Sequence, residues 1–231
     1  MTAQDLLRPR RLVAAALCLS LASVAVAQRT GTRLDRNQGA AGSIGTRDVK
    51  SAIKVAHAFG QCIAFREEKR TRRALELPLV SPEQAKVMNG AQDTFDECLG
   101  TSREFDQIGF SQLLLAGSAA EYFVRSSQAK VDMAPLLGMT DETLATTAFK
   151  PRNGLEDLGM CIVRRHPKNA RAFVMSRPAE ADEAAAFKAL LPDVGLCVFQ
   201  GETMKMNAPN VRAIVAYALY RAASKMGASG A

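Results

Sequence analysis

The segment GQCIAFREEKRTRR, residues 60–73, has a counterpart 99 residues further along the chain, GMCIVRRHPKNARA, residues 159–172. The third residue of each segment is a cysteine, Cys62 or Cys161, and a second cysteine follows 36 residues later, Cys98 or Cys197. Between positions 60 and 98, the offset of 99 gives eight identities over 39 gapless positions. Equal cysteine spacing and the same order of matches favour an internal duplication.

The match continues beyond the second cysteine at a slightly different offset. Residues 120–125, AEYFVR, fall on residues 216–221, AYALYR, when the offset is 96. Identity this low is also compatible with a chance match between unrelated segments. Because the cysteine spacing is the same, we interpret the chain as two tandem repeats.

The N-terminal segment has the three parts of a secretory signal peptide. Three arginines precede the apolar run Leu12–Val24, and Ala25-Val26-Ala27 follows as a small-residue cleavage site before Gln28. The alternative is a membrane anchor, but this run is shorter than the ~20 residues that span a bilayer. We therefore predict a signal peptide over residues 1–27, a periplasmic or secreted protein, and no transmembrane anchor after cleavage.

Cleavage would leave an even number of cysteines. Cys18 would be removed with the signal peptide, and four cysteines in an exported chain indicate two disulfides, for which three pairings exist. If the chain is duplicated, equivalent cysteines form equivalent bonds. This selects Cys62–Cys98 and Cys161–Cys197, one disulfide within each repeat.

Hydrophobic periodicity predicts an all-α fold of two similar repeats with about four helices each. Apolar residues recur at helical spacing through Val49–Ile63, and no convincing alternation of a β-strand is present. Ser81 followed by Pro82 predicts a helix start, and Asn153 predicts another. Further helices are expected over about 110–125, 167–174, 179–191, ending before Pro192, and 209–226.

These patterns divide the chain into successive segments. Residues 28–46, rich in glycine, are expected to be flexible, and repeats are expected at 47–126 and 152–225. Residues 127–151 would link the repeats, with the apolar stretch Met133–Met139 packed against them. Residues 226–231 are expected to form a mobile tail.

The composition is that of a globular chain rather than a disordered, fibrous or polytopic membrane protein. The 231 residues are 48% hydrophobic and 23% charged, with a net charge of +7. Without residues 1–27 the net charge falls to +5, which is too small to predict nucleic-acid binding. Anionic lipid or polysaccharide of the cell envelope is a more accessible partner for such a charge, although solubility alone also explains it.

Motifs that carry chemistry are absent. His57 and His166 lie in no zinc or haem arrangement, and no phosphate loop or nucleophile motif occurs, so no catalytic, cofactor-binding or metal-binding residue is predicted. We expect His166 at the surface. Glu67, Glu68 and Glu121 are possible acids or bases, but we expect each to be solvated or salt-bridged.

One polar feature occurs in both copies, a set of basic residues after the first cysteine. Cations near a helix C-terminus complement its partial negative charge, so a structural role is sufficient. The alternative is a pair of anion-binding corners that together bind an extended polyanion. The six residues of this possible anion site are Arg66, Lys69, Arg72, Arg165, Lys168 and Arg171.

The repeated pattern G-x-C-[IV]-x-x-x-R-x-x-K, a second cysteine and the terminal AYALYR resemble uncharacterised exported α-helical repeat proteins of Gram-negative bacteria with paired cysteines. The resemblance implies no activity and no functional residue. We therefore expect a non-enzymatic binding or scaffolding module of the cell envelope. The alternative is a periplasmic hydrolase or lipid-binding protein with a site between the two repeats.

Overall fold

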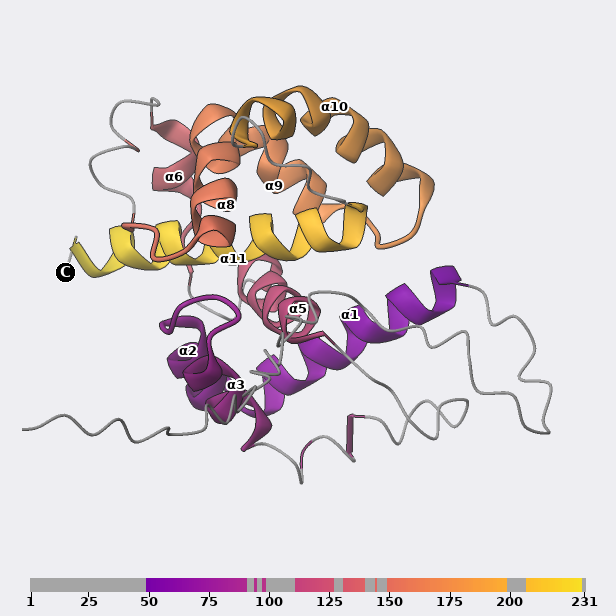
Figure 1. Ribbon diagram of the computed structural model, residues 1–231, viewed down its shortest axis with the longest axis vertical. Helices are drawn as coiled ribbons and strands as arrows, with labels where there is room; N and C mark the ends of the chain where they lie inside the picture. The colour runs from indigo at the N-terminus through magenta and orange to yellow at the C-terminus, as the bar shows by residue number, and fades with distance from the viewer. Residues whose placement is uncertain are drawn as a thin grey trace, which may run out of the picture. The chain divides into compact units, whose positions relative to one another are not determined.

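Every regular element in the described part of the chain is a helix, which confirms the predicted all-α class there (Figure 1). The computed structural model describes residues 49–90, 94, 97–98, 111–126, 131–139, 144, 149–198 and 207–229, the side chains as far as 226. All of them belong to one unit, Gly31–Ala231. The predicted signal peptide, 1–27, and the predicted flexible segment, 28–46, lie outside the described residues.

Four helices have defined bounds in the described residues of the N-terminal half. Ser81 accepts a hydrogen bond from the Gln84 backbone N–H, and Ser111 accepts one from the Leu114 N–H, so both helices begin at the capping residues that their sequences offer. The start predicted at Ser81 and Pro82 is confirmed. The helices are α1 (Val49–Arg66), α2 (Glu68–Leu75), α3 (Pro82–Asn89) and α5 (Gln112–Arg125).

The C-terminal half continues with a short helix and four longer ones. Asn153 caps α8 by accepting a hydrogen bond from the Glu156 N–H, as predicted. Pro167 occupies the first position of α9, where its missing N–H has no helical partner to lose. The helices are α6 (Ala134–Gly138), α8 (Gly154–Arg165), α9 (Pro167–Met175), α10 (Ala181–Cys197) and α11 (Ala208–Ser229).

Helices α5 and α11 form the centre of the core. Helix α5 packs against α1 and α11, and α11 also packs against α8 (Figure 1). Every residue from Val211 to Ala223 is buried. A Cβ atom on Gly117 would lie 2.2 Å from Cβ of Ala213, so only glycine allows the backbones of α5 and α11 to approach this closely.

Both disulfides have the predicted pairing. Cys62 is bonded to Cys98 with Cα atoms 5.8 Å apart, and Cys161 is bonded to Cys197 with Cα atoms 5.7 Å apart. Each bond joins one helix to a segment 36 residues later in the same half of the chain.

The turns that precede α3 and α10 contain the same unusual backbone geometry. Val80 has a φ of 63° and Ala179 has a φ of 59°, a left-handed conformation that is costly for residues other than glycine. The Val80 N–H donates to Gln84 Oε1 at 2.8 Å, and the Ala179 N–H donates to Glu183 Oε2 at 2.7 Å. These side-chain acceptors hold both turns in place.

Two helix ends differ from the sequence prediction. Helix α10 does not stop before Pro192; it passes through this proline and ends at Cys197, where the disulfide fixes it. A proline lacks only one backbone donor, and this loss is tolerated here. Helix α11 reaches Ser229, so its helical structure enters the predicted mobile tail.

The segment between the two halves packs as predicted where it is described. Met133 and Leu136 are buried, and so are Leu144 and Phe149 further along the segment. Residues 127–130 and most of 140–148 lie outside the description. Among the helices described, none is both long and apolar enough to cross a bilayer.

Candidate functional site

The basic residues predicted to form the first corner lie at the junction of α1 and α2, and two of the three are paired. Arg66 forms an ion pair with Glu97. Arg72 Nε donates to Glu68 Oε1 at 2.9 Å, and its guanidinium lies 4.4 Å from the centre of the Phe123 ring. Lys69 is exposed. Much of the positive charge of this corner is therefore compensated within the chain.

The second corner lies at the junction of α8 and α9. Arg165 Nε and His166 Nε2 are each 3.4 Å from Oδ1 of Asp193, which is buried at the end of α10. The His166 side chain is 56% exposed, which confirms its predicted place at the surface. Lys168 is exposed, and Arg171 is half-buried.

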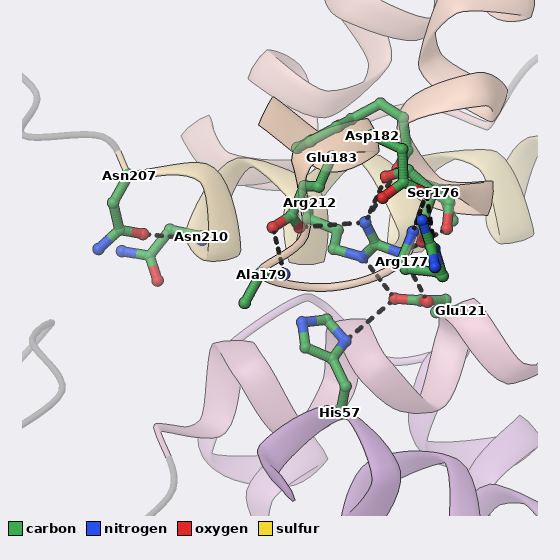
Figure 2. A network of polar contacts seen from close by, with 12 residues as sticks. His57, Glu121, Ser176, Arg177, Ala179, Asp182, Glu183, Asn207, Asn210 and Arg212 are labelled. Atoms are coloured by element: carbon green, nitrogen blue, oxygen red, sulfur yellow. Dashed lines mark hydrogen bonds and ion pairs between the residues drawn. The ribbon is translucent and has the colours of Figure 1, made fainter. Parts of the chain in front are cut away.

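A second set of polar residues, only partly foreseen from the sequence, lies in the interior. Arg212 on α11 is fully buried, and its guanidinium makes two hydrogen bonds to Glu121 on α5, at 2.9 and 2.8 Å (Figure 2). A third bond, 3.1 Å long, reaches Glu183 on α10. One cation thus joins three helices from both halves of the chain.

The same guanidinium also binds the C-terminal end of α9. It donates to the carbonyl oxygens of Phe173 at 2.9 Å, Val174 at 2.6 Å and Ser176 at 2.6 Å, and to Ser176 Oγ at 3.0 Å. Carbonyls at a helix end lack partners within the helix and carry partial negative charge. Arg212 satisfies these carbonyls and pairs with both carboxylates, and Arg125 supplies a second positive charge at Glu121.

Glu121 is the acidic centre of this group. Burial by itself would raise its pKa, but hydrogen bonds and charge from Arg212 and His57 outweigh burial and lower the pKa to about 2. Arg125, one turn later on α5, donates to Glu121 Oε1 at 2.7 Å. The carboxylate is therefore ionised at neutral pH, although its side chain is completely buried.

His57 on α1 completes the group from the other side (Figure 2). Its Nδ1 lies 3.1 Å from Glu121 Oε2, and its side chain is only 5% exposed. Both ring nitrogens are buried, and neither makes a geometrically complete hydrogen bond in the described part of the chain. We call His57, Glu121, Glu183 and Arg212 the His57 cluster.

A surface pocket with about 460 Å³ of empty space opens beside His57. Its other walls are Lys54, Ala58 and Gln61 of α1, Arg125 of α5, and Pro178 of the turn before α10. A smaller hollow on the other side of His57 is lined mainly by apolar residues of α1 and α5 and by Pro209. The His57 side chain thus lines two hollows, although both of its ring nitrogens are buried from solvent.

A matching polar group lies at the corresponding positions of the other half. Glu156 on α8 is 99 residues after His57, and Tyr217 on α11 is 96 residues after Glu121; the Tyr217 hydroxyl donates to Glu156 Oε1 at 2.9 Å. Arg152 donates to both oxygens of Glu156, and the Leu79 N–H donates to Oε1 at 2.9 Å. We call Glu156, Tyr217 and Arg152 the Glu156 cluster.

Protonation states in the Glu156 cluster are held by mutual contacts. Burial by itself would raise the pKa of Glu156, but bonds from Arg152 and from the Leu79 and Arg152 N–H groups outweigh burial and lower the pKa. Burial and the neighbouring Glu156 carboxylate raise the pKa of Tyr217. Every polar side-chain atom of this cluster therefore acts in a fixed donor or acceptor role.

An arginine at the end of each central helix reaches across to the other half. Arg125 of α5 donates to the carbonyl oxygens of Val174 and Ser176 at 3.2 and 3.0 Å. Arg221 of α11, 96 residues later, donates to the carbonyl oxygen of Leu75 at 3.1 Å. The acceptors Leu75 and Val174 are themselves 99 residues apart and lie at the ends of α2 and α9. Each half thus closes a helix end of the other.

No group of three or more histidine, cysteine or carboxylate side chains in the described residues could hold a metal ion. No family model, no curated protein and no solved structure matches this chain.

Glu67, Glu68 and Glu121 all have cationic partners, as expected of salt-bridged carboxylates. Sequence reasoning missed Arg212 and the pairing of His57. The signal available for Arg212 was its position beside the apolar run AIVAYALY, residues 213–220, where a charge must be paired if the helix is buried. No sequence motif indicates that His57 meets Glu121.

Proposed function

We propose that this chain is an exported, non-enzymatic binding or scaffolding module built from two tandem helical repeats. The observation that carries the proposal is the reciprocal contact of the two halves, in which Arg125 and Arg221 each bind a helix end of the other half. Together with two disulfides, these contacts favour a stiff body. A stiff body suits a module that presents a surface to partners.

Several independent correspondences support the duplication. Helices α1 and α8 end 99 residues apart, α2 and α9 begin 99 residues apart, and α5 and α11 begin 96 residues apart. The left-handed residues Val80 and Ala179 are also separated by 99 positions. Gly60 would contact Ser118 through a Cβ atom, and Gly159 would contact Ile214, which are pairs at these same offsets.

Export is supported by the N-terminal signal pattern and by the two disulfides, since such bonds persist in oxidising compartments. N-terminal sequencing of the protein recovered outside the cytoplasm should begin at Gln28. Recovery of a form that begins at Met1 would contradict the proposed cleavage.

The proposed partner is anionic lipid or polysaccharide of the cell envelope, bound by the two basic corners. Lys69 and Lys168 are exposed and occupy equivalent positions after α1 and α8. Arg66, Arg72 and Arg165 form ion pairs within the chain, and Arg171 is half-buried, so the two lysines offer the most accessible charge. Two weak sites on one stiff body can bind an extended polyanion with avidity.

The test is retention on acidic vesicles and on an acidic polysaccharide. Replacing all six corner residues, Arg66, Lys69, Arg72, Arg165, Lys168 and Arg171, should abolish retention, and salt should weaken it because the Debye length falls from about 10 Å at 0.1 M to about 3 Å at 1 M. Each corner is also replaced alone, and a variant with the exposed Lys86, Lys150 and Lys188 replaced by glutamine is the control that removes the same three charges elsewhere. No salt-sensitive retention of the unaltered protein would assign the corners a structural role only.

One observation favours the second candidate, a hydrolase or lipid-binding protein with a site between the repeats. The pocket beside His57 has walls from both halves, and Nδ1 of this histidine lies 3.1 Å from a Glu121 carboxylate oxygen, a pairing of residue types that general bases use. Hydrolysis of ester or phosphoester substrates that is lost in His57→Gln but kept in His166→Gln would favour this candidate. Equal activity of both variants would exclude it.

A further inference from the structure

We infer that the outer face of helix α10 docks on the surface of an anionic lipid bilayer. The inference rests on the proposed function, because it takes the anionic partner proposed there and assigns it to lipid rather than to polysaccharide. Helix α10 lies at the periphery of the described part of the chain, and one side of it is exposed along its whole length (Figure 1).

The polarity of α10 is inverted relative to an ordinary surface helix, which directs its polar residues to solvent. Its buried residues include Glu183 and Asp193, whereas all but one of its exposed residues lack a polar side chain. At 3.6 residues per turn, the exposed positions form one continuous arc of about 160° around the helix. They are four alanines, Lys188, Leu191, Pro192, Gly195 and Leu196.

Two leucines make the C-terminal part of this face suitable for contact with lipid. Leu191 and Leu196 are 46% and 66% exposed, and they are two of the four large apolar side chains exposed in the described part of the chain. Removing such side chains from water lowers the free energy. A helix that lies flat on a bilayer buries its apolar face at the boundary between headgroups and acyl chains.

Cations adjoin the two leucines. Arg165 Nε lies 3.4 Å from Oδ1 of Asp193, and the disulfide of the second half also joins α8 to the end of α10, so the second basic corner lies next to this face. Lys168 of that corner is exposed, and so is Lys188 on the face itself. An anionic bilayer attracts these cations and also accommodates the leucines, whereas a hydrated polysaccharide offers the leucines no apolar surroundings.

The carboxylates near this face do not oppose docking. Glu180 and Asp182, at the start of α10, form ion pairs with Lys54 and Arg177. Asp193, near the end of the helix, is buried and directed towards the second basic corner. Repulsion from an anionic surface is therefore weakest at the C-terminal part of the helix, where the leucines lie.

A second copy of the chain fits this face less well than a bilayer does. In a two-fold contact, residues near the axis meet their own counterparts. Lys188 lies near the middle of the face, so its ammonium would approach that of the second chain, and like charges repel. Lipid headgroups instead offer phosphate oxygens, with which an ammonium forms charge-assisted hydrogen bonds.

The first experiment uses the absence of tryptophan from the sequence, which lets one introduced tryptophan report on its surroundings. When vesicles of phosphatidylglycerol are added to the full-length exported protein, Leu196→Trp should show blue-shifted emission and quenching by brominated phospholipid. Val49→Trp, at an exposed apolar position on α1, is the control and should show neither. Vesicles of phosphatidylcholine should leave both variants unchanged.

Two results of this experiment overturn the inference. One is an unshifted emission of Leu196→Trp on phosphatidylglycerol vesicles that retain the protein, because the face would then lie away from the lipid. The other is a shift that occurs without vesicles and grows with protein concentration, which would identify a second copy as the occupant of the face.

Substitutions then measure what each part of the face contributes. Leu191→Gln combined with Leu196→Gln should weaken binding to phosphatidylglycerol vesicles about tenfold or more. Lys188→Gln should weaken it about fivefold, the contribution of one cation near an anionic surface, and Val49→Gln should leave it unchanged. These positions are exposed, so the fold should be retained. Binding of the double leucine variant as tight as that of the unaltered protein overturns the inference.

Retention on alginate, an acidic polysaccharide, separates this test from that of the proposed function. Any retention on alginate should be the same in the double leucine variant. It should also be unchanged in the three-lysine control variant, which contains Lys188→Gln and should bind the vesicles about fivefold more weakly. If the unaltered protein is retained on alginate but not on phosphatidylglycerol vesicles, the lipid inference fails and the proposed function stands. If the protein is retained on neither, both fail.

Discussion

The His57 cluster and the Glu156 cluster occupy corresponding places in the two halves of the chain but differ in how completely their polar groups are paired. In the Glu156 cluster, a tyrosine hydroxyl, an arginine and a backbone N–H surround one carboxylate. In the His57 cluster, the carboxylate lies on the central helix, a fully buried arginine from α11 binds it, and neither nitrogen of the histidine makes a complete hydrogen bond in the described residues.

This difference distinguishes a cluster that only stabilises the fold from one that also contains polar atoms the fold leaves unpaired. Unpaired buried polar atoms cost free energy, and native proteins contain few of them. The Glu156 cluster has the arrangement expected of a structural network. The His57 cluster combines a structural network, centred on Arg212, with a buried imidazole whose two nitrogens make no complete hydrogen bond in the described residues. Functional sites are the places where a chain departs from complete pairing.

The largest expected effect is the loss of Arg212. Arg212→Met should lower the free energy of unfolding by about 3–5 kcal/mol, because it leaves two buried carboxylates and several helix-end carbonyls without their donor. Urea denaturation measures the change. The matched control is Arg152→Met in the Glu156 cluster; its side chain is 33% exposed, so the smaller loss of about 1–2 kcal/mol is expected. Equal losses of unfolding free energy in both variants would mean that the two clusters contribute equally to stability.

The second largest effect is expected from removing the disulfide of either half. Replacing Cys62 and Cys98 together by alanine removes a closed loop of 37 residues, and the chain-entropy model predicts a cost of about 3.8 kcal/mol. Replacing Cys161 and Cys197 should cost the same, since that loop has the same length. Denaturation of each double variant gives the two costs. If the two losses of unfolding free energy differ by more than about 2 kcal/mol, the two disulfides do not stabilise their halves equally.

These two disulfides also show what sequence could predict. Spacing of four cysteines, cap residues such as Ser81 and Asn153, and helical periodicity are local or repeated signals, and each gave a correct element. Pro192 misled the prediction because a proline usually ends a helix, whereas α10 is held to Cys161 by the disulfide at its end.

The candidate site was harder to predict because its contacts join distant parts of the chain. Arg212 and Glu121 are 91 residues apart, and their meeting depends on the crossing of α5 and α11 at Gly117. Sequence alone indicates that each buried charge needs a partner, but it does not name the partner. Glu121 was recognised as a polar residue in an apolar helix, whereas the orientation of His57 follows only from the packed structure.

The pH dependence of stability tests the ionisation of the His57 cluster. The pKa of Glu121 is about 2 in the folded protein against an ordinary value of 4.5, so its contribution to stability is present above pH 4.5 and is lost as the pH falls towards 2. The shift corresponds to about 3 kcal/mol. Urea denaturation at several pH values should show this loss, and Glu121→Gln should show a smaller pH dependence over the same range. An unchanged pH dependence in Glu121→Gln would contradict the assignment.

The smallest expected effect on the free energy of unfolding comes from replacing His57, the residue that distinguishes the two clusters. His57→Gln should change the free energy of unfolding by less than about 1 kcal/mol, because a glutamine amide can still donate to Glu121 and the fold loses no bond at Nε2. Its counterpart is Tyr217→Phe, which removes a hydroxyl whose single proton is shared between the Leu77 carbonyl, 2.7 Å away, and Glu156 Oε1, 2.9 Å away, and should cost about 1–2 kcal/mol. Urea denaturation of both variants at neutral pH makes the comparison. Because His57 matters little for stability but lines the pocket, its replacement is expected to affect ligand binding instead. If His57→Gln lowers the free energy of unfolding more than Tyr217→Phe does, His57 is a structural residue like those of the Glu156 cluster.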